Sequence, residues 1–251
     1  MLLLLGMVMA GAVPGGAADA TACEIDDELC TELDADASCV AAGLFASGSP
    51  PTTSAYARTV LKDPTIGLER DHEDPHQLLV GFTTRAIPGP PSPLNVPRVD
   101  VSVHVGIIES QCHSYTNDSI TTTKSCGDAK LGELTVDIEA TGAPKISIKA
   151  EHLFVSSCVA AEPTPRPSST TMHAERVVIS SGSGSYTLPT ITPQPGPVVP
   201  IGFPDSYVAF NERSEDASPP GCSMGGGSAM RIVLGNEQIV FGATQVMACQ
   251  L

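Results

Sequence analysis

The sequence contains no tryptophan and few other aromatic residues, with 4 tyrosines and 6 phenylalanines among 251 residues. Carbohydrate-binding modules usually hold sugars on a platform of aromatic rings, so this shortage argues against that class. Basic residues are also scarce, since 13 lysines and arginines face 28 acidic residues and the net charge is −15. A chain of this charge repels nucleic acid and anionic membrane surfaces, so we expect neither as a partner.

Long apolar runs are missing beyond the N-terminus. The stretch MLLLLGMVMAGAV has the length of a signal-peptide core and is too short to span a membrane. Ala18-Asp19-Ala20 then fits the small-residue pattern of a cleavage site. We therefore predict a signal peptide over residues 1–20 and a secreted protein without a membrane span. Lipid anchoring through Cys23 is the alternative, but ATAC lacks the usual leucine, and lipidation would leave an odd number of cysteines.

No C-x-x-C pair occurs, which argues against a zinc cluster. An even number of cysteines follows the predicted cleavage site, as expected for disulfides in an exported chain: Cys23, Cys30, Cys39, Cys112, Cys126, Cys158, Cys222 and Cys249. Cys112 and Cys126 bracket a polar loop between two strands, and Cys222 and Cys249 flank a hairpin, so we predict these two pairs. Cys158 would then bind one of Cys23, Cys30 and Cys39, and the other two would pair locally.

Convincing amphipathic helices are absent from most of the chain, and short alternating apolar runs are frequent. VDVSVHV (99–105), LTVDIE (134–139) and ISIKAE (146–151) each place their apolar residues on one face of a strand. Polar or Pro/Gly-rich loops separate these strands from several others. The pattern predicts an all-β fold, an antiparallel β-sandwich over residues 99–251. After Glu151 the apolar residues change parity, which predicts either a bulge near His152 or a strand buried on both faces.

The residues before position 99 have a different composition. Residues 21–57 form an acidic three-cysteine segment, in which the spacing of Ile25, Leu29 and Leu33 favours a helix. Residues 58–98 are mixed and become Pro-rich, as in an extended connection. We therefore expect an acidic arm and a connection ahead of the sandwich.

Four stretches of the C-terminal half resemble the exported bacterial proteins of the choice-of-anchor P family: KLGELTVDIEA, ISIKAEHLFVSSC, SYVAFNER and GSAMRIVLGNEQIVFGATQVMAC. The resemblance implies an exported β-domain presented at or outside the cell surface. It implies no catalytic residues, because the members share variable anchoring and not a reaction. No sortase motif or apolar tail follows Cys249, so we expect release more than surface attachment.

Gly221-Cys222-Ser223-Met224-Gly225 fits G-x-S-x-G, the nucleophile elbow of α/β-hydrolases. That elbow needs a buried strand before the serine and a helix after it. Pro219 and Pro220 precede the motif and a glycine-rich stretch follows, which suits neither element. The fold also requires a histidine after the serine, and none follows His173. We predict a turn here and no catalytic serine.

RDHEDPHQ (residues 70–77) places His72 and His76 four residues apart among carboxylates. Imidazole and carboxylate groups are suitable Zn²⁺ ligands. Pro75 disfavours the helix that would bring both rings to one face, so we expect a solvated polar loop and no cofactor.

These observations favour one hypothesis, a secreted non-enzymatic domain with a structural or interaction role and an unidentified extracellular partner. Two alternatives stay open, an extracellular metal-dependent hydrolase using His72 and His76, and a ligand-binding module.

Overall fold

The computed structural model describes the backbone of residues 35–46, 52–62, 69–79, 82–87, 99–117, 122–140, 143–161, 168–182, 184–191, 195–203, 205–214, 220–235 and 237–250. Every regular element in these ranges is a β-strand, and all strand pairs are antiparallel. The predicted all-β class is therefore confirmed.

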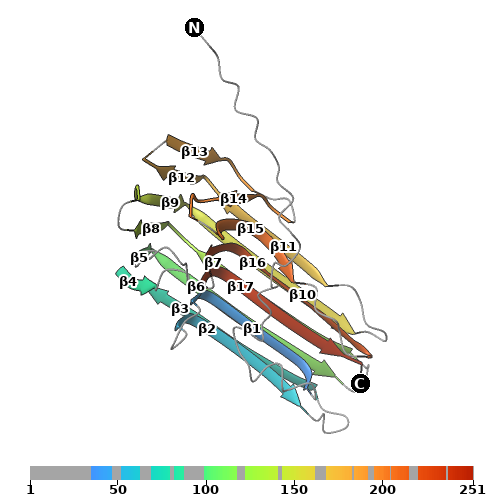
Figure 1. The fold of residues 1–251 in the computed structure, drawn as a ribbon. Coiled ribbons are helices and arrows are strands. Elements are labelled where there is room, and N and C mark those ends of the chain that lie inside the picture. The colour runs from blue at the N-terminus through green and yellow to red at the C-terminus, as the bar shows by residue number, and fades with distance from the viewer. Residues whose placement is uncertain are drawn as a thin grey trace.

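The strands form three sheets (Figure 1). Sheet A has the order β14 (Val198–Pro200), β15 (Ser206–Ser214), β16 (Cys222–Leu234), β17 (Glu237–Cys249), β1 (Ala35–Ala46) and β2 (Thr52–Lys62). Sheet B has the order β11 (Ser169–Glu175), β10 (His152–Ala161), β7 (Thr122–Leu131), β6 (Ile107–Asn117) and β3 (Glu69–Leu79). Sheet C has the order β13 (Gly184–Leu188), β12 (Val177–Ser181), β9 (Ile146–Ala150), β8 (Leu134–Ala140), β5 (Val99–Val105) and β4 (Phe82–Ile87).

Sheets B and C are two halves of one long layer, because each strand of sheet B is joined along the chain to a strand of sheet C at the same place in the order, and β13 is an additional strand at one edge of sheet C. Pairing persists across the boundary, where Gly106 N–H donates to Glu133 O and Gly132 N–H to Ile107 O, both at 2.9 Å. Along the strands on either side of these glycines, the buried positions nevertheless switch between odd and even residue numbers at the boundary. Val103 and Val105 are buried before the boundary and Ile108 after it. The strands whose side chains are described on both sides of this line therefore rotate there, and we call the line the crease.

The crease also explains the parity change in ISIKAEHLFVSSC. Ile146, Ile148 and Ala150 are buried in β9, whereas Leu153 and Val155 are buried in β10. The switch falls at Glu151, next to the predicted bulge at His152.

Sheet A packs face to face on the long layer, with β17 lying over β7 and β10. The two ends of the interior differ in composition. Between sheet C and strands β15, β16 and β17 of sheet A, the core contains large apolar side chains such as Phe210, Phe241 and Ile232. Between sheets A and B it contains small residues, and the Ser157 hydroxyl hydrogen-bonds Thr244 Oγ1 across the layers at 2.7 Å. The fold is thus the predicted antiparallel sandwich.

The described disulfides correct most of the predicted pairing. Cys222 and Cys249 are bonded across the β16–β17 hairpin, as predicted. The predicted bond between Cys112 and Cys126 is wrong, because Cys39 bonds Cys112 and Cys126 bonds Cys158. Cys112 and Cys126 do lie on neighbouring strands. Successive side chains of a strand alternate between faces, and the buried series places Cys112 inside sheet B and Cys126 outside it.

The acidic segment is nonetheless joined to the sandwich, through Cys39 and not through Cys158. Cys23 and Cys30 lie outside the described residues, as do the predicted signal peptide over residues 1–20 and the predicted helix at Ile25.

Strands before residue 99 belong to the same sheets. β1 and β2 complete sheet A, β3 is an edge of sheet B, and β4 is an edge of sheet C. The sandwich therefore extends beyond the predicted 99–251 range into the segments assigned as an arm and a connection. Their strand structure depends on pairing with distant partners, such as β17 for β1, which local sequence does not reveal.

Candidate functional site

Ser223 lies within a strand and not at a strand-to-helix turn. It is the second residue of β16, it is opposite Ala248 of β17, and it is buried. The turn predicted at this motif is wrong from Cys222 onward, because these residues form an extended strand, and an extended strand does not provide a nucleophile elbow.

His72 and His76 lie on β3, whose backbone pairs with β6 opposite Ser114 and Ser110. The predicted loop at residues 70–77 is therefore a strand. Four residues of extended backbone separate the two Cα atoms by about 13 Å. Their side chains lie outside the described part of the structure, so the metal hypothesis stays a prediction. Among the side chains that are described, no three His, Cys, Asp or Glu residues cluster in a way that suits a metal ion.

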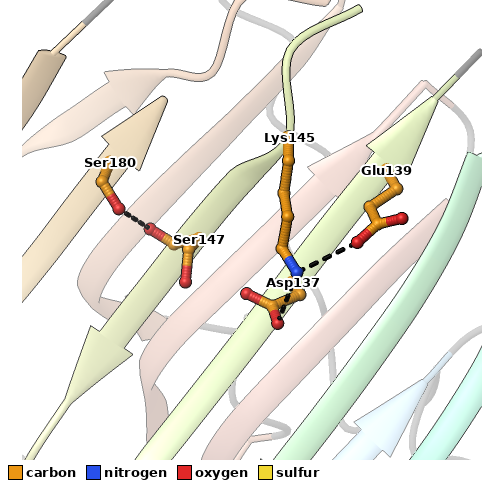
Figure 2. Close-up of polar contacts among 5 residues, drawn as sticks. All are labelled: Asp137, Glu139, Lys145, Ser147 and Ser180. Carbon is orange, nitrogen blue, oxygen red and sulfur yellow. Dashed lines mark hydrogen bonds and ion pairs between the residues drawn. The ribbon is translucent and has the colours of Figure 1, made fainter. Parts of the chain in front are cut away.

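A group of charged side chains lies on the outer face of sheet C (Figure 2). The ammonium of Lys145 is 3.0 Å from Asp137 Oδ2 and 3.0 Å from Glu139 Oε1. Nearby, the Ser180 hydroxyl donates to the main-chain oxygen of Ser147 at 3.3 Å. Burial opposes ionisation of Asp137, but hydrogen bonds from Ser147 and Lys145 outweigh it and hold the pKa of Asp137 below its ordinary value.

Hydrogen bonds to Glu139 and Asp137 raise the pKa of Lys145 in turn. The lowered pKa of Asp137 and the raised pKa of Lys145 keep these two groups ionised at neutral pH, and the Lys145 ammonium also pairs with Glu139. The arrangement therefore suits a surface ion cluster that links β8 to the start of β9, and it presents no group poised for proton transfer.

Replacing Lys145 with glutamine is expected to raise the pKa of Asp137, because the variant loses both a hydrogen bond and a positive charge. NMR titration of the Asp137 carboxyl carbon measures this pKa. Lys149→Gln is the matched control and should have a smaller effect, because Lys149 acts only through a weaker Coulombic attraction. An equal shift in both variants would contradict the assignment.

The lowered pKa of Asp137 determines how the stability of the fold depends on pH. Stability contributed by ionised Asp137 is fully present above the ordinary value of 3.8 and is lost as the pH falls through the lower folded pKa.

A second charged pair lies in sheet A. Arg231 Nε and Nη2 donate to the two carboxylate oxygens of Glu212, each at 2.6 Å. Arg231 is only 4% exposed, and this bidentate hydrogen bonding satisfies its buried charge. We assign the pair a structural role between β15 and β16.

A groove of about 460 Å³ lies at the end of the sandwich, between sheet C and the β14 side of sheet A. This volume is in the range of small-molecule sites. Its most buried lining residues are Ile146 of β9, Ile179 of β12 and Ile201 after β14, each less than a tenth exposed. The groove is therefore an opening into the apolar core between the two layers.

The walls of the groove are also uncharged. Tyr186 of β13 lines one side and is 53% exposed, while Val199, Pro200 and Phe203 line the other. No residue that lines the groove is charged. A rim of glycine and serine supplies main-chain and hydroxyl groups that can orient a bound molecule.

Sequence reasoning missed this groove, because its lining comes from three separate stretches at 143–146, 179–186 and 199–203. One signal was available. The sequence from Val177 to Pro204 contains no Asp, Glu, Lys, Arg or His, in a chain with a net charge of −15. A charge-free tract of this kind marks a surface on which burial against another molecule costs little electrostatic desolvation.

The described disulfides indicate an oxidising compartment, because such bonds persist where thiols are not kept reduced. Within the part of the chain that the structure describes, no helix has the length and hydropathy needed to cross a membrane.

Comparisons with known proteins give no match of any kind: no family model, no curated protein and no solved structure matches this chain.

Proposed function

We propose that this chain is a secreted, disulfide-stabilised interaction domain that holds an apolar, uncharged group in the groove between its two layers. The observation behind this proposal is the groove itself, a concave site with Ile146, Ile179 and Ile201 at its base and no charged lining residue. A charged ligand would lose hydration there without gaining a partner, so the groove favours neutral apolar groups.

The scaffold suits this role. Disulfides join the layers and the strands, and the groove lies on strands of the sandwich and the segments that join them. A site on rigid strands is preorganised, so little conformational entropy is lost when it binds. Export and a place outside the cell are supported by the disulfides and by the apolar N-terminal run, and they agree with the resemblance to the choice-of-anchor P family.

Binding of the uncharged dye N-phenyl-1-naphthylamine tests the proposal, because its fluorescence rises in apolar sites. We expect saturable binding by the full chain. Phe203→Ser removes part of an apolar wall and should weaken binding about five-fold, equivalent to roughly 1 kcal/mol of lost contact. Phe154→Ser is the matched control, since Phe154 is half-buried on the outer face of sheet B, far from the lining residues.

Dye affinity that is equal in the two variants, or absent in the unsubstituted chain, would refute the groove as the site. The alternative of a metal-dependent hydrolase at His72 and His76 predicts instead stoichiometric zinc in protein purified without chelator.

A further inference from the structure

The edges of the sheets are not equally protected. In the part of the chain that the structure describes, the edge strands are β2 and β14 in sheet A, β3 and β11 in sheet B, and β4 and β13 in sheet C. Charges and prolines on an edge strand prevent another strand from pairing with it. Every one of these strands except β13 has such a residue: Arg58 and Lys62 in β2, an acidic and basic run with Pro75 in β3, Arg85 in β4, Glu175 in β11 and Pro200 in β14.

β13 has the sequence GSYTL and contains neither a charge nor a proline. Its residues from Gly184 to Thr187 are exposed, and only Leu188 is buried. Figure 1 shows β13 at the outer edge of sheet C, with β12 as its neighbour. Among the described edge strands, β13 is therefore exposed to solvent and has no charged residue or proline that would oppose pairing with another strand.

The free main-chain groups of β13 can be assigned from the hairpin. Ser181 pairs with Gly184 next to the turn, and Ile179 pairs with Tyr186. Pairs beside a two-residue turn exchange main-chain hydrogen bonds, and alternate pairs do so along the strands. The N–H and C=O groups of Ser185 and Thr187 consequently point away from β12, toward solvent.

The surroundings of this edge are uncharged and partly apolar. β12, β13 and β14 all lie within the charge-free tract from Val177 to Pro204. Ile107, Tyr186 and Val198 are the large apolar side chains most exposed in the described residues, and two of these three lie in this tract. With a net charge of −15 on the chain, two copies repel over most of their surfaces but not here.

We propose that β13 pairs antiparallel with β13 of a second copy of this chain, about a twofold axis at Tyr186. In this register Ser185 of one copy is opposite Thr187 of the other, and the outward main-chain groups of both residues form about four hydrogen bonds. Sheet C then continues from one copy into the next. Since Tyr186 also lines the groove, the pairing brings the grooves of the two copies side by side.

A second copy fits this edge better than an unrelated strand does. An antiparallel pairing about a twofold axis is self-complementary, so one sequence supplies both halves of the interface. Among the described edge strands of each copy, β13 alone lacks a charged residue or proline, and the pairing uses β13 of both copies. The assembly therefore closes at a dimer and does not extend into a fibre.

The register gives a sharp test by charge pairs. In Ser185→Lys/Thr187→Lys, each lysine faces a lysine of the other copy, and like charges directly opposite each other oppose pairing. In Ser185→Lys/Thr187→Glu, each lysine faces a glutamate. The first variant also lowers the net negative charge of the whole chain, so any weakening it causes must come from the edge itself.

Sedimentation equilibrium of the full chain measures the dimer. We expect the unsubstituted chain to dimerise reversibly between about 10 µM and 1 mM, as a small interface allows. The Lys/Lys variant should dimerise about ten-fold more weakly, and the Lys/Glu variant at least as tightly as the original chain. Raising NaCl from about 0.05 to 0.5 M should tighten the original dimer, because salt screens the repulsion between two acidic chains.

Thermal melting of both variants checks that the monomer fold is intact, since Ser185 and Thr187 are exposed. A chain that stays monomeric throughout this concentration range would overturn the proposal. So would a dimer that the Lys/Lys variant leaves unchanged, because it would use another surface.

Discussion

Replacing Cys39 and Cys112 together with alanine is expected to lower the free energy of unfolding by about 4 kcal/mol. The bond closes a loop with a sequence separation of 73, longer than the 32 of Cys126–Cys158 and the 27 of Cys222–Cys249. Long loops restrict the unfolded chain most, so losing this bond returns the most conformational entropy to the unfolded state. Both sulfurs are buried between β1 and β6, and the bond joins sheet A to sheet B.

The double variant Cys222→Ala/Cys249→Ala is the matched control. Its loop is shorter and does not overlap the Cys39–Cys112 loop, so the same relation gives a loss about 1 kcal/mol smaller. Urea unfolding of the oxidised proteins measures both losses. A larger loss in the control than in the Cys39–Cys112 variant would contradict the ranking by loop length.

Non-reducing peptide mapping is a direct check on the pairing. We expect linked peptides that contain Cys39 with Cys112 and Cys126 with Cys158. A peptide that links Cys112 to Cys126 would contradict the structure, because it requires two side chains on opposite faces of sheet B to meet.

Several strands from residue 99 onward were predictable because their signal is local. Val99, Val101, Val103 and Val105 alternate with polar residues, and the structure places β5 over this run. The parity change at Glu151 was equally visible, because a strand that rotates in place shifts its buried residues by one position. The polar loop predicted between Cys112 and Cys126 is wrong, since residues 113–117 belong to β6 and residues 122–125 to β7.

The strands before residue 99 were not predictable in this way. β3 contains RDHEDPH and alternates no apolar residues over that stretch, yet its backbone pairs with β6 along its whole length. Pairing with a distant strand supplies the stabilisation that its own sequence lacks. The same long-range character explains the wrong disulfide, since the prediction considered proximity along the chain and not the face on which each cysteine lies.

The candidate site was only partly predictable. Its base comes from alternating positions such as Ile146 and Ile179, which the pattern identifies as buried but not as neighbours of Ile201. The order of the strands in the sheets brings the three segments that line the groove together, and the local sequence does not reveal that order. The charge-free tract around β13 is the part of the site that the sequence alone displays.

Phe241→Ala is expected to lower the free energy of unfolding by about 3–5 kcal/mol, the usual loss for a large ring removed from a tight core. Phe241 is fully buried in β17 and belongs to the large-residue end of the core. It is opposite Met230 of β16 and Leu44 of β1, so the cavity would open in the core against an inner strand of sheet A. Strands paired on both sides can collapse little into such a space, which keeps the loss large.

Phe154→Ala is the control, because it removes the same atoms from a half-buried position on the outer face of β10. Phe154 packs there on His173, with ring centroids 5.1 Å apart, and Lys130 lies 5.8 Å from its ring. Losing these partly solvated contacts should cost about 1 kcal/mol. Denaturant unfolding of both variants gives the comparison, and comparable losses at the two positions would show that the apolar core between sheets A and C does not dominate the stability of the fold.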